Sequence, residues 1–165
     1  MGKLGQRAGP KPVQISKIQQ RQDGAPILFQ SVMFPSVTIS LTIRRPFAAV
    51  YTFLSTPANL NEWINGVIER PLERLSDYHW QAQFDGEEVE LHFTPPNVYG
   101  VLDLRVSDDR GTRRQYWVRV LPNDDGAELS CTILQVRGET DAQFASECEW
   151  LRTDLNVLRN YIETH

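Results

Sequence analysis

A long apolar seam near the C-terminal end constrains the fold of this chain more than any other feature. Six apolar residues follow one another at spacings of 4, 3, 4, 3 and 4: Phe144, Cys148, Leu151, Leu155, Leu158 and Ile162. These spacings define one face of an α-helix, and Thr140 with Gln143 has the spacing of a capping box at its start. A seam of about 20 residues is about 30 Å long at 1.5 Å per residue. Such a helix requires an apolar groove of similar length.

The segments before this helix have the pattern of half-buried strands, which offer such a groove. Apolar residues alternate with Ser and Thr over 37–43. Six further strand-like segments are expected at about 67–75, 78–84, 88–94, 98–107, 113–121 and 127–136. Asp85-Gly86 is a two-residue hairpin signal. Pairing outward from it places Ala82 opposite Val89 and His79 opposite His92, so that apolar and polar residues separate onto two faces.

Between the first strand and the others, the sequence predicts two short helices. Four residues have helical spacing: Phe47, Val50, Tyr51 and Leu54. Pro57 ends this helix because proline lacks the backbone N–H and clashes with the preceding turn. Thr56 and Pro57 also suit the N-cap and first position of a second helix that runs to Glu62. We therefore expect a kinked helical lid that ends at Trp63.

The order of these elements predicts an α+β fold in which a curved, seven-stranded antiparallel sheet wraps around the long C-terminal helix. This helix-grip layout resembles the START/SRPBCC superfamily, which includes Bet v 1-like pollen allergens, lipid-transfer domains and polyketide cyclases. The stretches behind the resemblance are "ISLTIRRPFAAVYTFLSTPANLNEW", "YGVLDLRV", "VRVLPNDDGAELSCTILQ" and "DAQFASECEWLRTDLNVLRNYIE". They are similar to a bacterial polyketide cyclase/dehydrase-like branch. In that branch a His often follows the Asp of "GVLD", where this chain has Leu104.

Composition and charge narrow the classes of partner and compartment. Residues 1–30 are rich in Gly, Pro and Gln and carry five basic residues against one acidic residue, which predicts a disordered basic tail before a START/SRPBCC-like domain at 31–165. The remainder is acidic, which argues against nucleic acid as a partner. No apolar run is long enough to span a bilayer, and no secretory signal is visible. Cys131 and Cys148 lack a CxxC pattern and are expected to be reduced, so a cytoplasmic protein is predicted.

The alternation also predicts which side chains face the space between sheet and helix. The candidate ligand-binding residues are Trp63, Tyr78, Trp80, Leu91, Phe93, Leu102, Leu104, Tyr116, Val118, Cys131, Phe144, Cys148 and Leu151. No acid, base or histidine of the strands faces inward in this register. An apolar wall with a few polar tips suits a hydrophobic ligand held by shape, although the same pattern is also expected of a filled core.

Three residues are candidates for catalysis, and one cluster has side chains of the kinds that bind metals. Tyr78 and Tyr116 are possible proton donors, and Asp103 would be an acid if a β-bulge turned it inward. His79, His92 and Glu90 have the right ligand types for a divalent metal. No helical metal motif accompanies them, so neither a metal nor a cofactor is expected.

Three functions are compatible with these observations. The first is the binding of a lipid, isoprenoid or polyketide-like molecule in the cavity. The second, implied by the resemblance, is a cyclase, aromatase or dehydratase that acts on a polyketide-like substrate. The third, also implied by the resemblance, is a protein-interaction module like the heat-shock-chaperone ATPase activators. Unpaired edge strands are compatible with either a monomer or a homodimer.

Overall fold

The computed structural model describes residues 33–64, 72–84 and 86–165. The tail expected at 1–30 and most of the strand expected at 67–75 lie outside these residues. Phe34–His165 forms one unit of the chain, and the description below concerns that unit. Among the described helices, none combines the length and apolar character needed to cross a membrane.

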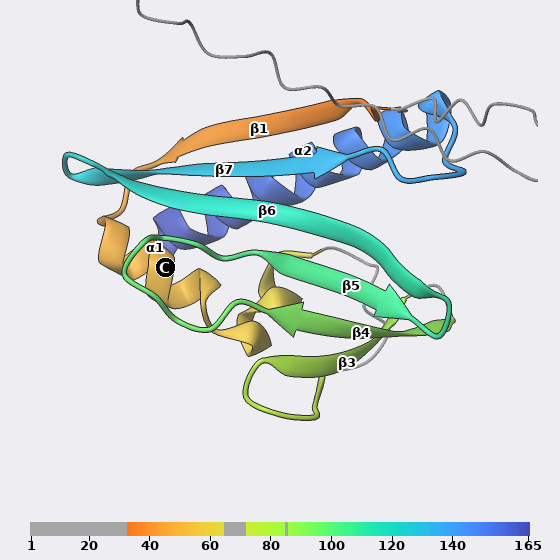
Figure 1. Ribbon diagram of the computed structural model, residues 1–165. Coiled ribbons are helices and arrows are strands. Elements are labelled where there is room, and N and C mark those ends of the chain that lie inside the picture. Colours follow the sequence, from red (N-terminus) through yellow and green to blue (C-terminus); the bar gives the residue numbers. More distant parts are fainter. Residues whose placement is uncertain (1–32, 65–71, 85) are drawn as a thin grey trace, which may run out of the picture. The chain divides into compact units, whose positions relative to one another are not determined.

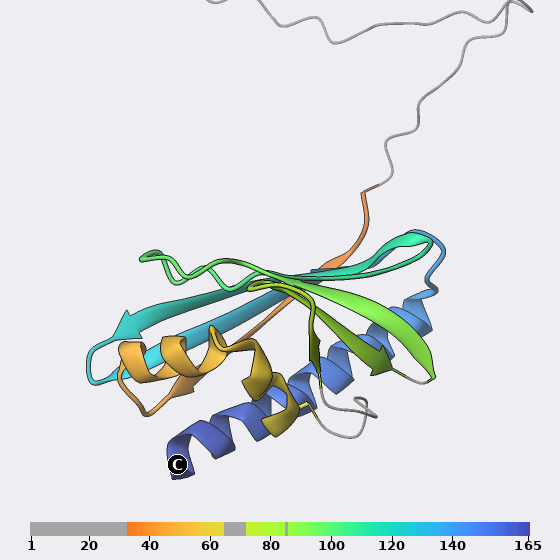
Figure 2. The ribbon, with the colours of Figure 1, turned by 90° about the horizontal axis from the view of Figure 1, so that it is seen from below.

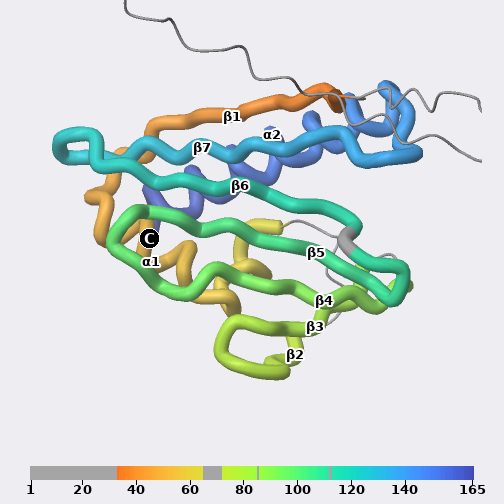
Figure 3. Tube along the Cα trace, in the orientation of Figure 1, coloured from red at the N-terminus to blue at the C-terminus, as the bar shows by residue number. Residues whose placement is uncertain are grey.

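Seven strands form one antiparallel sheet in the order β1-β7-β6-β5-β4-β3-β2 (Figure 1). The elements are β1 (Ser36–Ile43), α1 (Phe47–Leu54), the 3-10 helix η1 (Pro57–Glu62), β2 (Glu73–Arg74), β3 (His79–Phe84), β4 (Glu87–Phe93), β5 (Leu104–Asp108), β6 (Gly111–Asn123), β7 (Gly126–Leu134) and α2 (Asp141–Thr164). The expected α+β helix-grip architecture is therefore confirmed. Because β1 pairs with β7, the first and last strands lie side by side, and β2 ends the sheet beyond β3 (Figure 3).

All the helices lie on one face of the curved sheet (Figure 2). The six seam residues of α2 are buried, and they pack with apolar residues of β1, β6 and β7 into the main core. The predicted capping box is present. The Gln143 N–H donates to Thr140 Oγ1 over 3.2 Å, and the Thr140 N–H donates to Gln143 Oε1 over 2.9 Å. This box satisfies two of the N–H groups that a helix leaves unpaired at its start.

The break between α1 and η1 lies where the sequence predicts it, with Pro57 in the first turn of η1. The role expected of the Thr56 hydroxyl is wrong. Thr56 occupies the N-cap position, but its hydroxyl donates to the Thr52 carbonyl over 2.9 Å and does not cap η1. The physical reason is that the last carbonyls of α1 have no partner within the helix. The Asn59 side chain satisfies another of them, the Phe53 carbonyl, over 2.9 Å.

The β3–β4 hairpin has the predicted register, with Ala82 opposite Val89 and His79 opposite His92. The strand expected over 98–107 is wrong in its first half, because β5 begins only at Leu104. Between β4 and β5, Val101 forms an isolated bridge with Arg119 of β6. Gly100 has a positive φ of 69°, and a Cβ there would lie 2.0 Å from the Val120 carbonyl oxygen. This close approach and the positive φ together require glycine at position 100.

Candidate functional site: a cavity between the sheet and α2

A cavity of about 900 Å³ lies between the inner face of the sheet and α2. Its apolar wall joins the main core to a second apolar cluster around Leu60 and Leu91, so that both halves of the sheet contribute to it. η1 and the residues after it supply Leu60, Trp63 and Ile64. The kinked helical pair is thus part of the cavity wall, at the position that its sequence predicts.

Nine of the thirteen candidate ligand-binding residues line this cavity: Trp63, Leu91, Phe93, Leu102, Leu104, Tyr116, Val118, Cys131 and Leu151. Phe144 and Cys148 are buried in the main core and do not line it. Their contact with a ligand stays a prediction, as it does for the nine that line the cavity.

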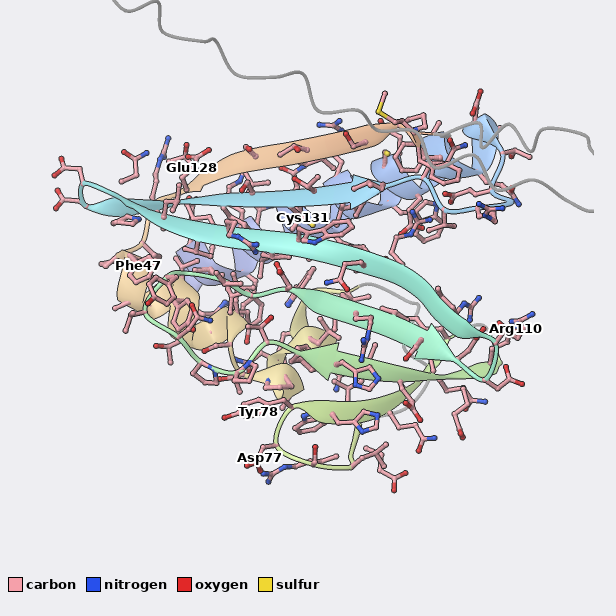
Figure 4. The ribbon with its side chains drawn as sticks, viewed as in Figure 1. Phe47, Asp77, Tyr78, Arg110, Glu128 and Cys131 are labelled. Atoms are coloured by element: carbon pink, nitrogen blue, oxygen red, sulfur yellow. The ribbon has the colours of Figure 1, made fainter. Side chains whose placement is uncertain are left out.

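Neither Tyr78 nor Trp80 lines the cavity. The inward position expected of Tyr78 is wrong, whereas Trp80 lies on the inner face as expected. Tyr78 is 40% exposed, because β3 begins only at His79 and Tyr78 belongs to the preceding bend. Figure 4 shows it beside Asp77, just before the start of β3. Trp80 packs in the second apolar cluster, and its indole N–H lies 3.5 Å from the Asp77 carbonyl oxygen.

Charged side chains also line the cavity, and the expectation that none faces it is wrong. They are Glu87, Arg113, Arg114, Glu139, Glu147 and Asp154. Two of them had a signal in the sequence. Arg114 is two residues before Tyr116 on the same strand, so alternation gives both the same face. Glu147 is four residues before Leu151 on α2, so both lie on one helical face. Arg113 also lines the cavity, although it is next to Arg114 on β6. The register shifts between Val106 and Ser107, so that β6 has an extra residue opposite β5 at this point.

Tyr116 and Glu147 form a hydrogen-bonded pair in the cavity wall. The Tyr116 hydroxyl donates to Glu147 Oε1 over 2.8 Å, and Arg114 Nε lies 3.7 Å from the same oxygen. Burial raises the pKa of Tyr116 well above its usual value, and the negative charge of Glu147 raises it further. The phenol therefore stays protonated at neutral pH and remains a hydrogen-bond donor.

A buried ion pair holds this part of the cavity in place. Arg114 Nη2 donates to Glu139 Oε1 over 2.6 Å, and Arg114 Nη1 donates to the Leu134 carbonyl over 2.8 Å. The other Glu139 oxygen accepts from the Val136 N–H over 3.1 Å. The side chains of Arg114 and Glu139 are only 11% and 10% exposed. The pair therefore ties β6 to the segment that joins β7 and α2, and it neutralises the Arg114 charge beside the cavity.

Comparisons with known proteins identify the fold but not the family within it. The sequence matches no protein-family model and no curated protein. A START superfamily protein from Mycobacterium smegmatis is 12% identical over 78% of this chain and 97% of its own, with a TM-score of 0.64. Norcoclaurine synthase from Thalictrum flavum, solved with dopamine and hydroxybenzaldehyde, is 15% identical over 81% of this chain and 88% of its own, with a TM-score of 0.60. The Aha1 dimer from Colwellia psychrerythraea is 14% identical over 78% of this chain and 96% of its own, with a TM-score of 0.58.

The chain has the START/SRPBCC helix-grip fold. Within this helix-grip domain, the catalytic candidate Asp103 does not reach the cavity. Its carboxylate pairs with Arg119 and accepts from the Val118 N–H over 3.0 Å. Leu102 and Leu104 both line the cavity, so no bulge reverses the alternation at Asp103. Asp103 lies just before β5 begins. Its carboxylate, rather than a main-chain carbonyl of β5, accepts the Val118 N–H of β6 there.

The two cysteines of this helix-grip domain are buried and are not joined to each other. Burial raises the pKa of the Cys131 thiol to about 12, and it also raises the pKa of Cys148. Both thiols are therefore protonated and weakly reactive at neutral pH. Cys131 contributes to the apolar wall from β7 (Figure 4), and Tyr116 is the one catalytic candidate that lines the cavity.

Proposed function

We propose that the protein binds a hydrophobic small molecule in the cavity between the sheet and α2. The observation behind this proposal is a cavity of about 900 Å³ with a largely apolar wall. Tyr116, Glu147 and Arg114 form a small polar cluster in that wall. Small-molecule sites are commonly clefts of about 300–1,000 Å³ whose few polar groups orient an otherwise apolar ligand. A filled core would leave no such space, and packed protein interiors hold few voids larger than a water molecule.

The polar cluster suggests what the ligand carries besides its apolar body. The Glu147 carboxylate accepts hydrogen bonds, and the neutral Tyr116 hydroxyl both donates and accepts. A hydroxyl or N–H group of the ligand would therefore find an acceptor there, while the rest contacts the apolar wall. A lipid, an isoprenoid or a polyketide-like aromatic with such a group has this chemistry. Norcoclaurine synthase, which shares the fold, was solved with two small aromatic molecules.

Two measurements test binding. Small molecules released by denaturing natively purified protein are identified by mass spectrometry against a mock preparation. The purified protein is also titrated with 1-anilinonaphthalene-8-sulfonate, an aromatic anion whose fluorescence rises when it binds in an apolar site. Val118→Phe adds bulk inside the cavity, whereas Leu121→Phe adds it on the same strand at a side chain that is 53% exposed. We expect Val118→Phe to lose both the co-purified molecule and the probe signal, with Leu121→Phe unchanged. Equal probe binding by the two folded variants would contradict the proposal.

A second candidate, a cyclase, aromatase or dehydratase, is favoured by the Tyr116–Glu147 pair. A protonated phenol in an apolar wall can turn its O–H toward a ligand carbonyl and stabilise charge that develops on that oxygen. Tyr116→Phe removes this donor with little change of shape. If the protein is such an enzyme, Tyr116→Phe retains ligand affinity but loses turnover of the molecule that mass spectrometry identifies. Loss of affinity without any turnover in the parent protein would favour binding alone.

The protein-interaction hypothesis, which would rest on the basic tail or on the outer face of the sheet, stays a prediction. The tail at 1–30 lies outside the described residues. A pull-down that survives Val118→Phe, which fills the cavity, would support the hypothesis. The cytoplasmic location and the choice between monomer and homodimer likewise stay predictions.

A further inference from the structure

Three potential metal ligands meet on the face of the sheet that points away from α2. Trp80 and Leu91 pack in the apolar cluster on the inner face, so the alternate residues of β3 and β4 project from the outer face. His79 and His92 are directly opposite each other in the hairpin register. Glu90 is two residues before His92 on β4, and is therefore diagonal to His79.

The ligand atoms of this cluster have the separations that a small metal ion requires. His79 Nε2 lies 3.1 Å from Glu90 Oε2, and His92 Nε2 lies 3.4 Å from the same oxygen. All three ligand atoms are within 4.8 Å of one another. Metal–ligand bonds of about 2.0–2.2 Å at tetrahedral angles place neighbouring ligand atoms about 3.3–3.6 Å apart. These separations are therefore compatible with one shared ion once the side chains turn toward it.

The hairpin holds the two histidines side by side. Their imidazole rings are stacked, with centroids 4.3 Å apart and an interplanar angle of 15°, so the rings must turn out of the stack before both Nε2 lone pairs can point at one ion. The His79, Glu90 and His92 side chains are 32%, 49% and 29% exposed, so each is partly held by its neighbours while an ion can still enter from solvent. The chain has three histidines, and two of them are in this pair.

We propose that His79, Glu90 and His92 form a binding site for a divalent transition-metal ion, with Zn²⁺ as the best match and the remaining coordination position open to solvent. Two imidazoles and one carboxylate form a ligand set that zinc accepts in proteins. One negative charge and two neutral nitrogens also complement a dication. The site is on the opposite face of the sheet from the cavity, so this inference is independent of the proposed ligand binding.

The charges around the cluster have opposing effects on a bound ion. Arg105, directly opposite His92 on β5, repels a cation, but its side chain is exposed and solvent ions screen it. The Glu90 carboxylate, 3.1 Å from His79 Nε2 and 3.4 Å from His92 Nε2, attracts a cation at the cluster. His92 Nε2 also lies 3.2 Å from the Ser107 hydroxyl, and this contact must be exchanged for the metal bond.

The test uses the full-length protein without a histidine tag, stripped of metal with a chelator and then titrated with ZnCl₂ by calorimetry. Co²⁺, whose visible absorption reports coordination number, serves as a spectroscopic probe. We expect one ion per chain and a change in the Co²⁺ spectrum. His79→Gln, Glu90→Gln and His92→Gln should each weaken Zn²⁺ binding by at least about tenfold, since even loss of an outer-shell partner costs 10–100-fold.

Two matched variants serve as controls. His165→Gln removes the remaining histidine, which stacks on Tyr161 at the end of α2. Glu88→Gln removes an exposed carboxylate from the same face of β4. Both should bind Zn²⁺ as the parent does, and circular dichroism should show that every variant is folded. The proposal is overturned if the parent binds no Zn²⁺ below millimolar concentration. It is also overturned if the folded His79→Gln and His92→Gln variants bind with unchanged affinity, or if Cys131→Ser abolishes binding.

Discussion

The buried pair of Arg114 and Glu139 allows a quantitative test of how the cavity is held together. Glu139→Gln keeps the size of the side chain but removes its negative charge, which leaves the Arg114 guanidinium buried without its main counter-ion. Breaking a buried pair by removing one partner costs about 3–5 kcal/mol. Arg114 keeps the Leu134 carbonyl at 2.8 Å and Glu147 at 3.7 Å, and a glutamine oxygen can still accept from the Val136 N–H. We therefore expect a loss near the lower limit, about 3 kcal/mol in the free energy of unfolding.

Urea unfolding at neutral pH, followed by tryptophan fluorescence, measures this loss. The chain has four tryptophans. In a thermal scan the same loss lowers Tm by about 6–12 °C, at about 2–4 °C per kcal/mol for a chain of this size. Glu149→Gln is the matched control, because its pair with Arg152 is on the surface of α2, with side chains 73% and 51% exposed. Exposed pairs contribute about 0–1 kcal/mol. Equal losses in the two variants would refute the reasoning from burial.

Three further substitutions probe the core, the start of α2 and the cavity wall. Ile133→Ala, at a fully buried side chain of β7, should cost about 2–5 kcal/mol in chemical denaturation, and a loss below 1 kcal/mol would show that the core is not packed as described. Thr140→Ala should lower the free energy of unfolding by about 1 kcal/mol because it removes the capping hydroxyl of α2. Thr140→Ser should lose much less because serine also caps, and equal losses in the two variants would contradict a role for the hydroxyl. The raised pKa of Tyr116 contributes stability below about pH 10 that is lost as pH rises above this value, because the unfolded chain then releases the proton first. Tyr116→Phe should therefore lose stability less steeply than the parent above pH 10, and parallel curves would contradict this sign.

The features that the sequence predicted correctly are those with a local physical cause. The seam of α2 is a repeat of about 3.6 residues, and its capping box joins Thr140 to Gln143 within one turn. The β3–β4 register depends on a two-residue turn and on the alternation beside it. Both patterns involve neighbours along the chain, so no knowledge of distant contacts was needed. The succession of such elements was enough to predict the helix-grip architecture.

The charged residues that line the cavity show what sequence periodicity cannot reveal. Arg114 shares its face with Tyr116, and Glu147 shares its face with Leu151, so both positions followed from the same periodicities that predicted the apolar wall. They were missed because a buried charge is expected only when a partner compensates it. For Arg114 that partner is Glu139, 25 residues along the chain. Sequence periodicity assigns a face, but it does not show which distant residue completes an ion pair.

By itself, the sequence determined the elements, their order and the inner face of each regular segment, because hydrophobic periodicity is imposed by the backbone of a single helix or strand. Tertiary structure decided where the strands stop being regular and which side chains meet across them. It exposed Tyr78 by starting β3 one residue later, and it paired Asp103 with Arg119 beyond the irregular start of β5. It also decided that the sheet and α2 are separated by a cavity. That space depends on the curvature of the whole sheet, which arises from long-range pairing and packing that no single segment encodes.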